Sequence, residues 1–291
     1  MEQQRHERST RCAIPYAHAY CMNCVSLALQ PLVTQQSTSR SPVLEMQRES
    51  SGMSQLQQAD DAARRQLQSE IENLVRLQPT TVVLADQVLT WYRVANPEQL
   101  LELAVNSQLP PEEVDPFWAA TWRAAIGLDR FLDRIDCSGL HILELGCGSG
   151  QAGTGAAARG GQVLMTDAVP LALQVAKLNA WPWRHQIQFQ TLKWKVQRLD
   201  HAPFPLIIGS DLVYDPNLFP SLEACCRQHL AQGGRLLLSE PHRHTGDRFA
   251  EWICQAGWQT VEHDVDLGDD RVPIRIFECS LSTNHRARAD R

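Results

Sequence analysis

A glycine-rich turn between two apolar runs carries the clearest chemical signal in the sequence. Glycines alternate with other residues in Glu144-Leu-Gly-Cys-Gly-Ser-Gly150, directly after the strand-like run 141–145. Such glycines let a ligand approach the backbone closely, at the sheet edge where α/β folds bind their ligands. Asp167 ends the next apolar run. Its carboxylate could there accept two hydrogen bonds from the hydroxyl groups of a ribose.

Two classes of nucleotide ligand fit this turn. Gly148-Ser-Gly-Gln-Ala-Gly153 matches the G-x-G-x-x-G pattern of dinucleotide sites, and Asp167 would also suit the ribose of NAD. That match begins later after the strand than a pyrophosphate turn does. Glu144 also places a negative charge near the strand end, which favours a cationic ligand. S-adenosylmethionine, with its sulfonium and ammonium groups, is therefore the expected cofactor, and a dinucleotide and a purely structural turn are the remaining alternatives.

The segment around the turn alternates strands with helices. Strands are predicted over 141–145, 162–166, 186–192, 204–210, 235–239, 258–265 and 272–281. Helices are predicted over 151–159, 170–180, 217–231 and 246–256. This order predicts a doubly wound α/β fold, with a mostly parallel seven-strand sheet covered by helices on both faces. The predicted catalytic domain occupies residues 112–281.

The chain ahead of this domain is expected to change in character. Residues 1–59 are rich in Gln, Ser, Thr and Arg and lack sustained periodicity. They are expected to be a disordered extension, or to precede a true start at Met46 or Met53. Residues 60–111 are predicted to form a helical extension, with one helix over 60–77 and another from Asn96 to about residue 106. Thr81-Val-Val-Leu84 between them could be a short extended piece. The tail, 282–291, is expected to be disordered.

Charge and cysteine content exclude several classes. With 27 Lys and Arg against 33 Asp and Glu, the chain offers no basic surface for nucleic acid. No apolar run is long enough to span a membrane, and the amino terminus lacks the apolar core of a secretory signal. The nine cysteines are expected to be reduced thiols in a cytoplasmic protein, with organellar targeting by the extension left open. Cys21 and Cys24 lack further ligands at zinc spacing, so no metal site is expected.

These motifs together resemble a known family. The glycine turn with Asp167 is similar to that of the class I, seven-strand S-adenosylmethionine-dependent methyltransferases. Three further features resemble one branch, the small protein-lysine methyltransferases related to the electron-transfer-flavoprotein beta-subunit lysine methyltransferase. They are Asp115-Pro-Phe-Trp118 with Trp122, Leu128 and Phe131 ahead of the turn, Trp194 after the third strand, and Gly209-Ser-Asp-Leu-Val-Tyr-Asp215 after the fourth. The resemblance covers about residues 112–281.

The resemblance implies a role for each matching residue. The implied cofactor-binding residues are Trp122, Glu144, Gly146, Cys147, Gly148, Gly150, Asp167, Trp194 and Ser210. Glu144, Gly146 and Gly148 would line the methionine end of S-adenosylmethionine, with Cys147 as a small packing residue. Asp167 would hold the ribose, Trp194 would lie against the adenine, and Trp122 would close over the cofactor. Ser210 and Asp211 would face the transferred methyl group.

The same resemblance implies a lysine-bearing protein as the methyl acceptor. Methyl transfer from a sulfonium is an in-line displacement that needs the lone pair of the amine. A lysine has a reference pKa of about 10.4, so exposing that lone pair near pH 7 costs roughly 4–5 kcal/mol. A carboxylate raises this pKa further, so Asp211 is expected to capture and orient the ammonium rather than act as a strong base. Tyr214 is expected to hydrogen-bond the amine or to wall the pocket. Asp211 and Tyr214 are the predicted catalytic residues.

Other interpretations stay open at this point. The same core could methylate a small-molecule amine, or it could be a non-catalytic, partner-binding protein that keeps the cofactor pocket only as structure. Asp211 to Pro216 could be a helix cap and turn. Trp118 is favoured as a core residue, and His242-Arg-His244 as a solvated loop rather than a substrate contact. The protein is expected to be a monomer.

Overall fold

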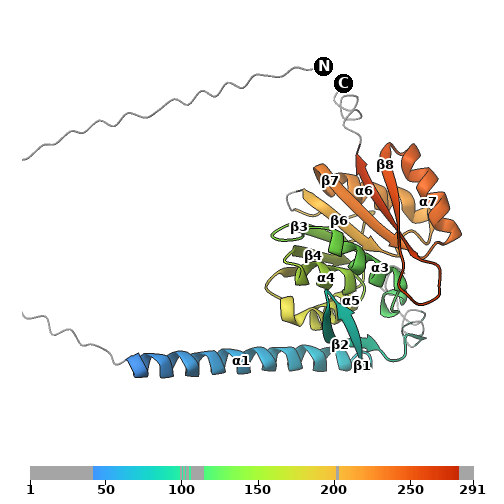
Figure 1. Cartoon of the computed structure of the whole chain (residues 1–291). Helices are drawn as coiled ribbons and strands as arrows, with labels where there is room; N and C mark the ends of the chain where they lie inside the picture. The colour runs from blue at the N-terminus through green and yellow to red at the C-terminus, as the bar shows by residue number, and fades with distance from the viewer. Residues whose placement is uncertain are drawn as a thin grey trace, which may run out of the picture. The chain divides into compact units, whose positions relative to one another are not determined.

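The computed structural model describes residues 42–98, 100, 102, 105, 115–200 and 203–281 (Figure 1). Internal contacts divide the chain into two units, 1–52 and 53–291, and the predicted site lies wholly in the second. The predicted tail 282–291, and residues 1–41 of the predicted extension, lie outside the described residues. None of the described helices is long and apolar enough to cross a membrane.

A seven-stranded sheet forms the centre of the second unit, with strand order β5-β4-β3-β6-β7-β9-β8. Its strands are β3 (His141–Leu145), β4 (Gln162–Asp167), β5 (Ile187–Thr191), β6 (Phe204–Ser210), β7 (Leu230–Glu240), β8 (Trp258–Val265) and β9 (Ile274–Leu281). Only β9 runs antiparallel to its neighbours β7 and β8 among these strands. The order proceeds outward from β3 in both directions, so the switch point between β3 and β6 is where such folds bind ligands. The predicted α/β fold is confirmed.

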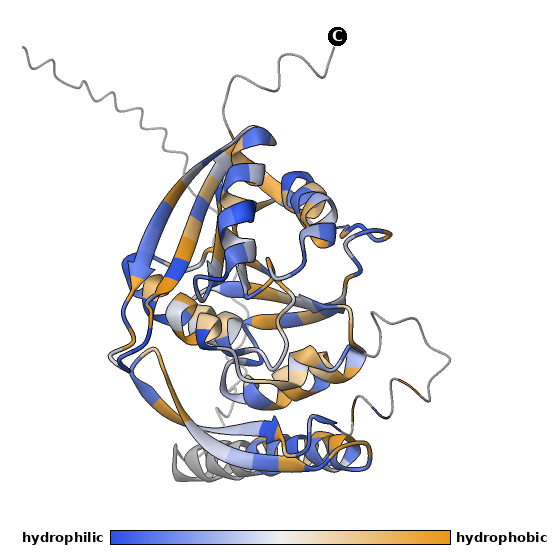
Figure 2. Cartoon of the chain, turned by 90° about the vertical axis from the view of Figure 1, so that its right-hand side faces the viewer, coloured by the Kyte–Doolittle hydropathy of each residue, from blue (hydrophilic) through white to orange (hydrophobic). Residues whose placement is uncertain are grey.

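Helices cover both faces of this sheet. They are α3 (Arg123–Phe131), α4 (Gln151–Ala158), α5 (Pro170–Asn179), α6 (Phe219–His229) and α7 (His244–Gln255). Alternate strand residues point to opposite faces, so Ile142 packs in a core with α3 and α4, while Leu143 packs in a second core with α6 and α7. Figure 2 shows hydrophobic and hydrophilic residues alternating along these helices and strands.

The segment ahead of the domain differs from its prediction. Helix α1 (Pro42–Glu72) already includes residues 42–59, which were expected to be disordered. The expected helical extension over 60–111 contains a hairpin instead, formed by β1 (Leu77–Leu84) and β2 (Gln87–Val94). The β-branched run Thr80-Thr-Val-Val83 favours a strand, and the turn residues Ala85 and Asp86 both take a positive φ, as a two-residue hairpin turn requires. The helix predicted over 96–106 falls mostly on residues outside the described set.

The hairpin is joined to the domain by a third core and by one buried side chain. Ile71, Val75 and Val94 pack against the α5 residues Ala172, Val175 and Leu178. Asn179 is buried, and its Oδ1 accepts the Tyr92 backbone N–H at 2.8 Å. Its Nδ2 donates to the Ser149 carbonyl at 3.1 Å. Residue Asn179 therefore connects β2 to the glycine turn.

Candidate active site

A cavity of about 980 Å³ opens beside the carboxyl ends of the parallel strands. Its wall takes residues from the turns after β3, β4, β5, β6 and β7, because the carboxyl ends of parallel strands meet at one edge of a sheet. From the predicted site, the wall includes Trp122, Gly146, Cys147, Gly148, Asp167, Trp194, Ser210, Asp211 and Tyr214. Glu144 and Gly150 are not among the described residues that line it.

The glycine turn needs its glycines for conformation and for space. Gly146 and Gly148 have φ values of 58° and 52°, in the left-handed region. A Cβ atom at Gly146 would lie 2.6 Å from Leu212 Cδ2, and one at Gly148 would lie 3.2 Å from the Trp118 carbonyl oxygen. Any larger residue at either position would therefore collide with Leu212 or with the Trp118 backbone, so the turn itself requires glycine there. The turn forms a cradle, of which Gly146, Cys147 and Gly148 line the cavity. Gly150 lies behind it as the cap of α4, where a Cβ atom would lie 2.9 Å from Ala176 Cβ.

Asp167 holds this cradle in place. Its Oδ2 accepts the Gly148 N–H at 2.9 Å, and its Oδ1 accepts the Val169 N–H at 2.9 Å. Burial raises the pKa of Asp167 to about 6, against the effect of these two bonds. Each carboxylate oxygen can accept more than one hydrogen bond, so Asp167 keeps capacity for ribose hydroxyls on the cavity side.

Glu144 lies beneath the turn rather than in the cavity. The residue is buried, and a Cβ atom at Gly153 would collide with its Oε2. Oε2 has no hydrogen-bond partner among the described residues. Burial raises the pKa of Glu144 to about 8, so the carboxyl is mostly protonated near neutral pH. The sequence predicts that Glu144 contacts the cofactor; in the structure its side chain is buried beneath the turn and is not among the described residues that line the cavity.

Aromatic side chains form much of the remaining wall. Trp122, just before α3, donates its Nε1–H to the Phe117 carbonyl at 2.9 Å. The Phe117 and Tyr214 rings meet edge to face, with centroids 6.3 Å apart. Trp118 is buried in the core beneath the hairpin, as the sequence favoured, and also lines the cavity. Trp194 enters the wall from the loop after β5.

The predicted acceptor residues lie on the same wall, just after β6. Asp211 has a φ of 56°, and its N–H donates to the Ser239 carbonyl at 2.7 Å, which fixes an unfavourable backbone conformation. Burial raises the pKa of Asp211, and the Arg243 guanidinium opposes that shift. Burial also raises the pKa of Tyr214 to about 12, which keeps its hydroxyl neutral.

Arg243 is a site residue that the sequence interpretation missed. It was expected in a solvated loop, yet its Nη2 donates to Asp211 Oδ2 at 2.6 Å and its Cζ lies 5.5 Å from the centre of the Trp122 ring. The sequence signal that could have identified Arg243 as a site residue is its position just after β7, because the carboxyl end of β7 lies at the same sheet edge as those of β3 and β6. Among the described residues, no group of three or more His, Cys, Asp or Glu could hold a metal ion.

Comparison with known proteins agrees with this arrangement. Residues 112–254 match a family model described as lysine methyltransferase. The chain is 35% identical over 130 residues to Protein N-lysine methyltransferase METTL21A of Danio rerio, a match that covers 41% of this chain and 58% of that protein. It is 30% identical over 167 residues to EEF1A lysine methyltransferase 3 of Mus musculus, covering 55% of this chain and 70% of the relative.

Among solved structures, the chain is similar to the glycopeptide N-methyltransferase MtfA complexed with S-adenosyl-L-homocysteine. The TM-score is 0.49 at 15% sequence identity, over 65% of this chain and 100% of that one. Three findings agree on the family of this chain. They are the family match, the coverage of 70% of the mouse relative and the seven-stranded sheet. The chain belongs to the lysine methyltransferase family.

Proposed function

We propose that this protein transfers the methyl group of S-adenosylmethionine to the side-chain amine of a lysine in a protein substrate. The observation that carries the proposal is the placement of Asp211 on the same cavity wall as the glycine turn and Asp167. One wall thus offers a nucleotide cradle and a buried carboxylate for a cationic acceptor. The chain spans 58% of the METTL21A relative, so activity and substrate are proposed here for the aligned domain.

The cofactor end of the cavity fits S-adenosylmethionine. Gly146, Cys147 and Gly148 line the cavity, so a ligand can lie against the backbone of the turn. Asp167 would accept hydrogen bonds from the ribose hydroxyls, and Trp194 would lie against the adenine ring. Trp122 would cover the cofactor from the start of α3. When bound, S-adenosylmethionine supplies a methyl group that its positively charged sulfur makes reactive.

The acceptor end fits an amine. The Asp211 side chain is only 5% exposed, and its Oδ1 has no hydrogen-bond partner among the described residues. An incoming lysine would donate to this oxygen and be oriented by it. The Tyr214 hydroxyl and the Phe117 ring would enclose the alkyl chain and exclude water. Such burial lowers the pKa of the lysine and helps to expose its lone pair.

We further propose that the acceptor is a protein rather than nucleic acid, and that the enzyme acts as a monomer in the cytoplasm. The net charge of −6 supports a cationic partner over a polyanionic one. The six cysteines within the described residues are free, as a reducing compartment favours. The names of both relatives refer to lysine methylation, and that of the Danio rerio relative names a protein as the substrate.

Radiolabelled S-adenosylmethionine with a gel-filtered cell lysate tests this function. We expect label in a discrete protein band, recovered as methyl-lysine after acid hydrolysis. Label that appears only when the small-molecule fraction is restored would instead favour a small-molecule amine acceptor. Calorimetry with S-adenosylhomocysteine tests the remaining alternative, a non-catalytic binding protein. A protein of that kind would show no affinity for S-adenosylhomocysteine.

A further inference from the structure

Arg243 and Asp211 form an ion pair on the acceptor side of the cavity. Arg243 Nη2 lies 2.6 Å from Asp211 Oδ2, with 38% of the arginine side chain exposed against 5% of the aspartate. The guanidinium also lies over the Trp122 ring, so the pair touches the residue proposed to cover the cofactor. A buried carboxylate without a cation would be costly, and this arginine supplies the cation.

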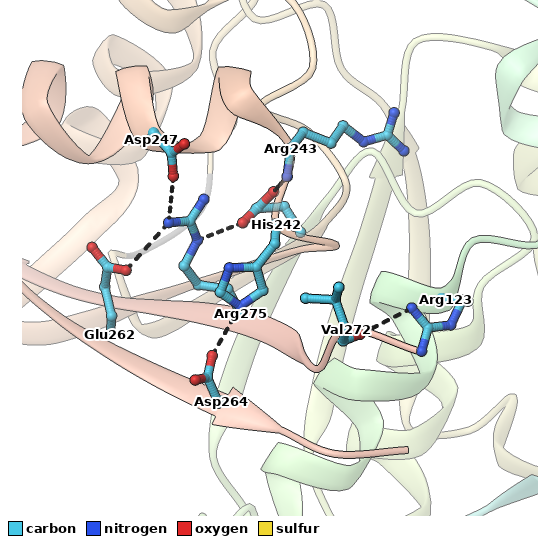
Figure 3. A network of polar contacts seen from close by, with 9 residues as sticks. Arg123, His242, Arg243, Asp247, Glu262, Asp264, Val272 and Arg275 are labelled. Atoms are coloured by element: carbon cyan, nitrogen blue, oxygen red, sulfur yellow. Dashed lines mark hydrogen bonds and ion pairs between the residues drawn. The ribbon is translucent and has the colours of Figure 1, made fainter. Parts of the chain in front are cut away.

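The backbone of Arg243 is anchored by a second charge network, in which Glu240 and Arg275 are buried. Its N–H donates to Glu240 Oε2 at 2.6 Å, and Glu240 Oε1 accepts from Arg275 Nε at 2.5 Å. Arg275 in turn bonds Asp247 at 2.9 Å and lies 3.4 Å from Glu262. Figure 3 shows Asp247 and Glu262 around Arg275, while the Arg243 side chain extends away from them. The network therefore fixes the backbone of Arg243, while the guanidinium at the other end of the side chain contacts Asp211.

We infer that Arg243 is a positioning residue for the methyl acceptor: it neutralises Asp211 and holds its Oδ2, so that Oδ1 can orient a lysine amine without retaining it as an ammonium ion. The inference rests on the proposed function. A carboxylate alone would stabilise the protonated, unreactive form of the lysine, whereas a carboxylate already paired with a guanidinium presents little net charge. The pair could therefore hold the acceptor by hydrogen bonding while it loses its proton.

The reaction then balances without a further reagent. The lysine ammonium releases one proton to solvent, and its nitrogen lone pair forms a bond to the methyl carbon. The carbon–sulfur bond breaks, and its electron pair stays on sulfur as the neutral thioether of S-adenosylhomocysteine. The methylated nitrogen releases a second proton to solvent if another methyl group is to be added.

Other charged groups lie around the acceptor position. Asp115, Asp167, Asp211 and Asp215 all act on the Tyr214 hydroxyl, and Glu240 acts on Asp211 from behind. Lys193 and Lys195 line the cavity from the loop after β5. Carboxylates thus face the acceptor position from several elements, and each would hold a lysine in its charged form. Arg243 is the cation hydrogen-bonded to the central one.

The pH dependence of methyl transfer tests the role of Arg243. The acceptor is the protein fraction of a gel-filtered lysate, and methyl-lysine is measured from about pH 6 to about pH 10. In Arg243→Met, the rising limb of the pH–rate profile should move to higher pH by about 1–3 units, because one charge at hydrogen-bonding distance shifts a pKa by about that much. A shift of one pKa unit lowers the deprotonated fraction of the lysine about tenfold, so the rate near neutral pH should fall at least about tenfold. The rate should recover at alkaline pH. Arg243→Lys should keep the wild-type limb.

Controls separate this effect from damage to the fold. Arg248→Met makes the same change at an exposed position of α7 and should leave the profile unchanged. Arg243→Gln provides a second neutral variant, and thermal unfolding identifies any variant that fails to fold. An Arg243→Met or Arg243→Gln enzyme that folds and keeps the wild-type pH profile, even at a lower rate, overturns the inference. If the wild-type protein labels no lysine, the proposed function itself fails and this inference fails with it.

Discussion

The Asp167 carboxylate and the Gly148 backbone are joined by a hydrogen bond of 2.9 Å, which ties the end of β4 to the turn after β3. This bond connects the group proposed to hold the ribose with the cradle proposed to receive the methionine end of the cofactor. A change at Asp167 should therefore act on cofactor binding in two ways, through the lost ribose contacts and through a looser turn.

Asp167→Asn should weaken the binding of S-adenosylhomocysteine by about 1–3 kcal/mol, or about 5- to 150-fold in Kd. The amide nitrogen of Asn cannot accept a hydrogen bond, so at least one of the bonds to Gly148, Val169 or the ribose is lost. Isothermal titration calorimetry measures this directly. Asp61→Asn, the same change at an exposed position of α1, is the matched control and should bind as the wild type does. Unchanged affinity in Asp167→Asn would remove this residue from the cofactor site.

Glu144 should make the protein less stable as the pH rises. Burial raises its pKa from the ordinary 4.5 to about 8, so the folded state holds this proton more tightly than the unfolded chain does. The stabilisation is complete below about pH 4.5 and is lost as the pH rises through about 8. Asp167, with a pKa raised to about 6, contributes in the same direction at lower pH.

Glu144→Gln should therefore flatten this part of the stability profile, because an amide cannot ionise in the buried position. Urea unfolding at about pH 5 and about pH 8 should show a smaller loss of unfolding free energy in the variant than in the wild type. Equal losses in the two proteins would show that Glu144 does not titrate in this range.

Gly148→Ala should impair cofactor binding beyond its cost in stability. The left-handed backbone at this position disfavours any L side chain by about 1–2 kcal/mol, and the added Cβ would lie 3.2 Å from the Trp118 carbonyl. Gly233→Ala is a matched control, since Gly233 has a φ of 72° and no atom within 4 Å of an added Cβ. Both variants should lose similar stability in thermal unfolding, and only Gly148→Ala should lose affinity in calorimetry. Equal affinities would contradict the cradle.

The sequence predicted the sheet well because strands buried on both faces and helices with one apolar face leave strong periodic signals. The extended piece over 81–84 was anticipated and is part of β1. Its pairing with β2 in a hairpin was missed because the turn, Ala85-Asp86, lacks the Asn-Gly or Gly-Gly signature, and Pro79 argues against a strand. The sequence could not show that Glu144 points beneath the turn, because a strand that is apolar on both faces does not reveal which way a single polar residue points. Arg243 was missed because its partner Asp211 lies 32 residues away and only tertiary structure brings them together.

The central claim, that Asp211 receives a lysine acceptor beside the cofactor cradle, is tested most directly by Asp211→Asn. The measurement is the rate at which tritiated methyl enters methyl-lysine in gel-filtered lysate protein, with S-adenosylhomocysteine affinity determined on the same preparations. We predict that the variant keeps its cofactor affinity and loses at least about 100-fold in rate, as expected when a group that orients the reactants is removed. Asp61→Asn should match the wild type in both measurements. An Asp211→Asn enzyme that methylates lysine at the wild-type rate would contradict the claim.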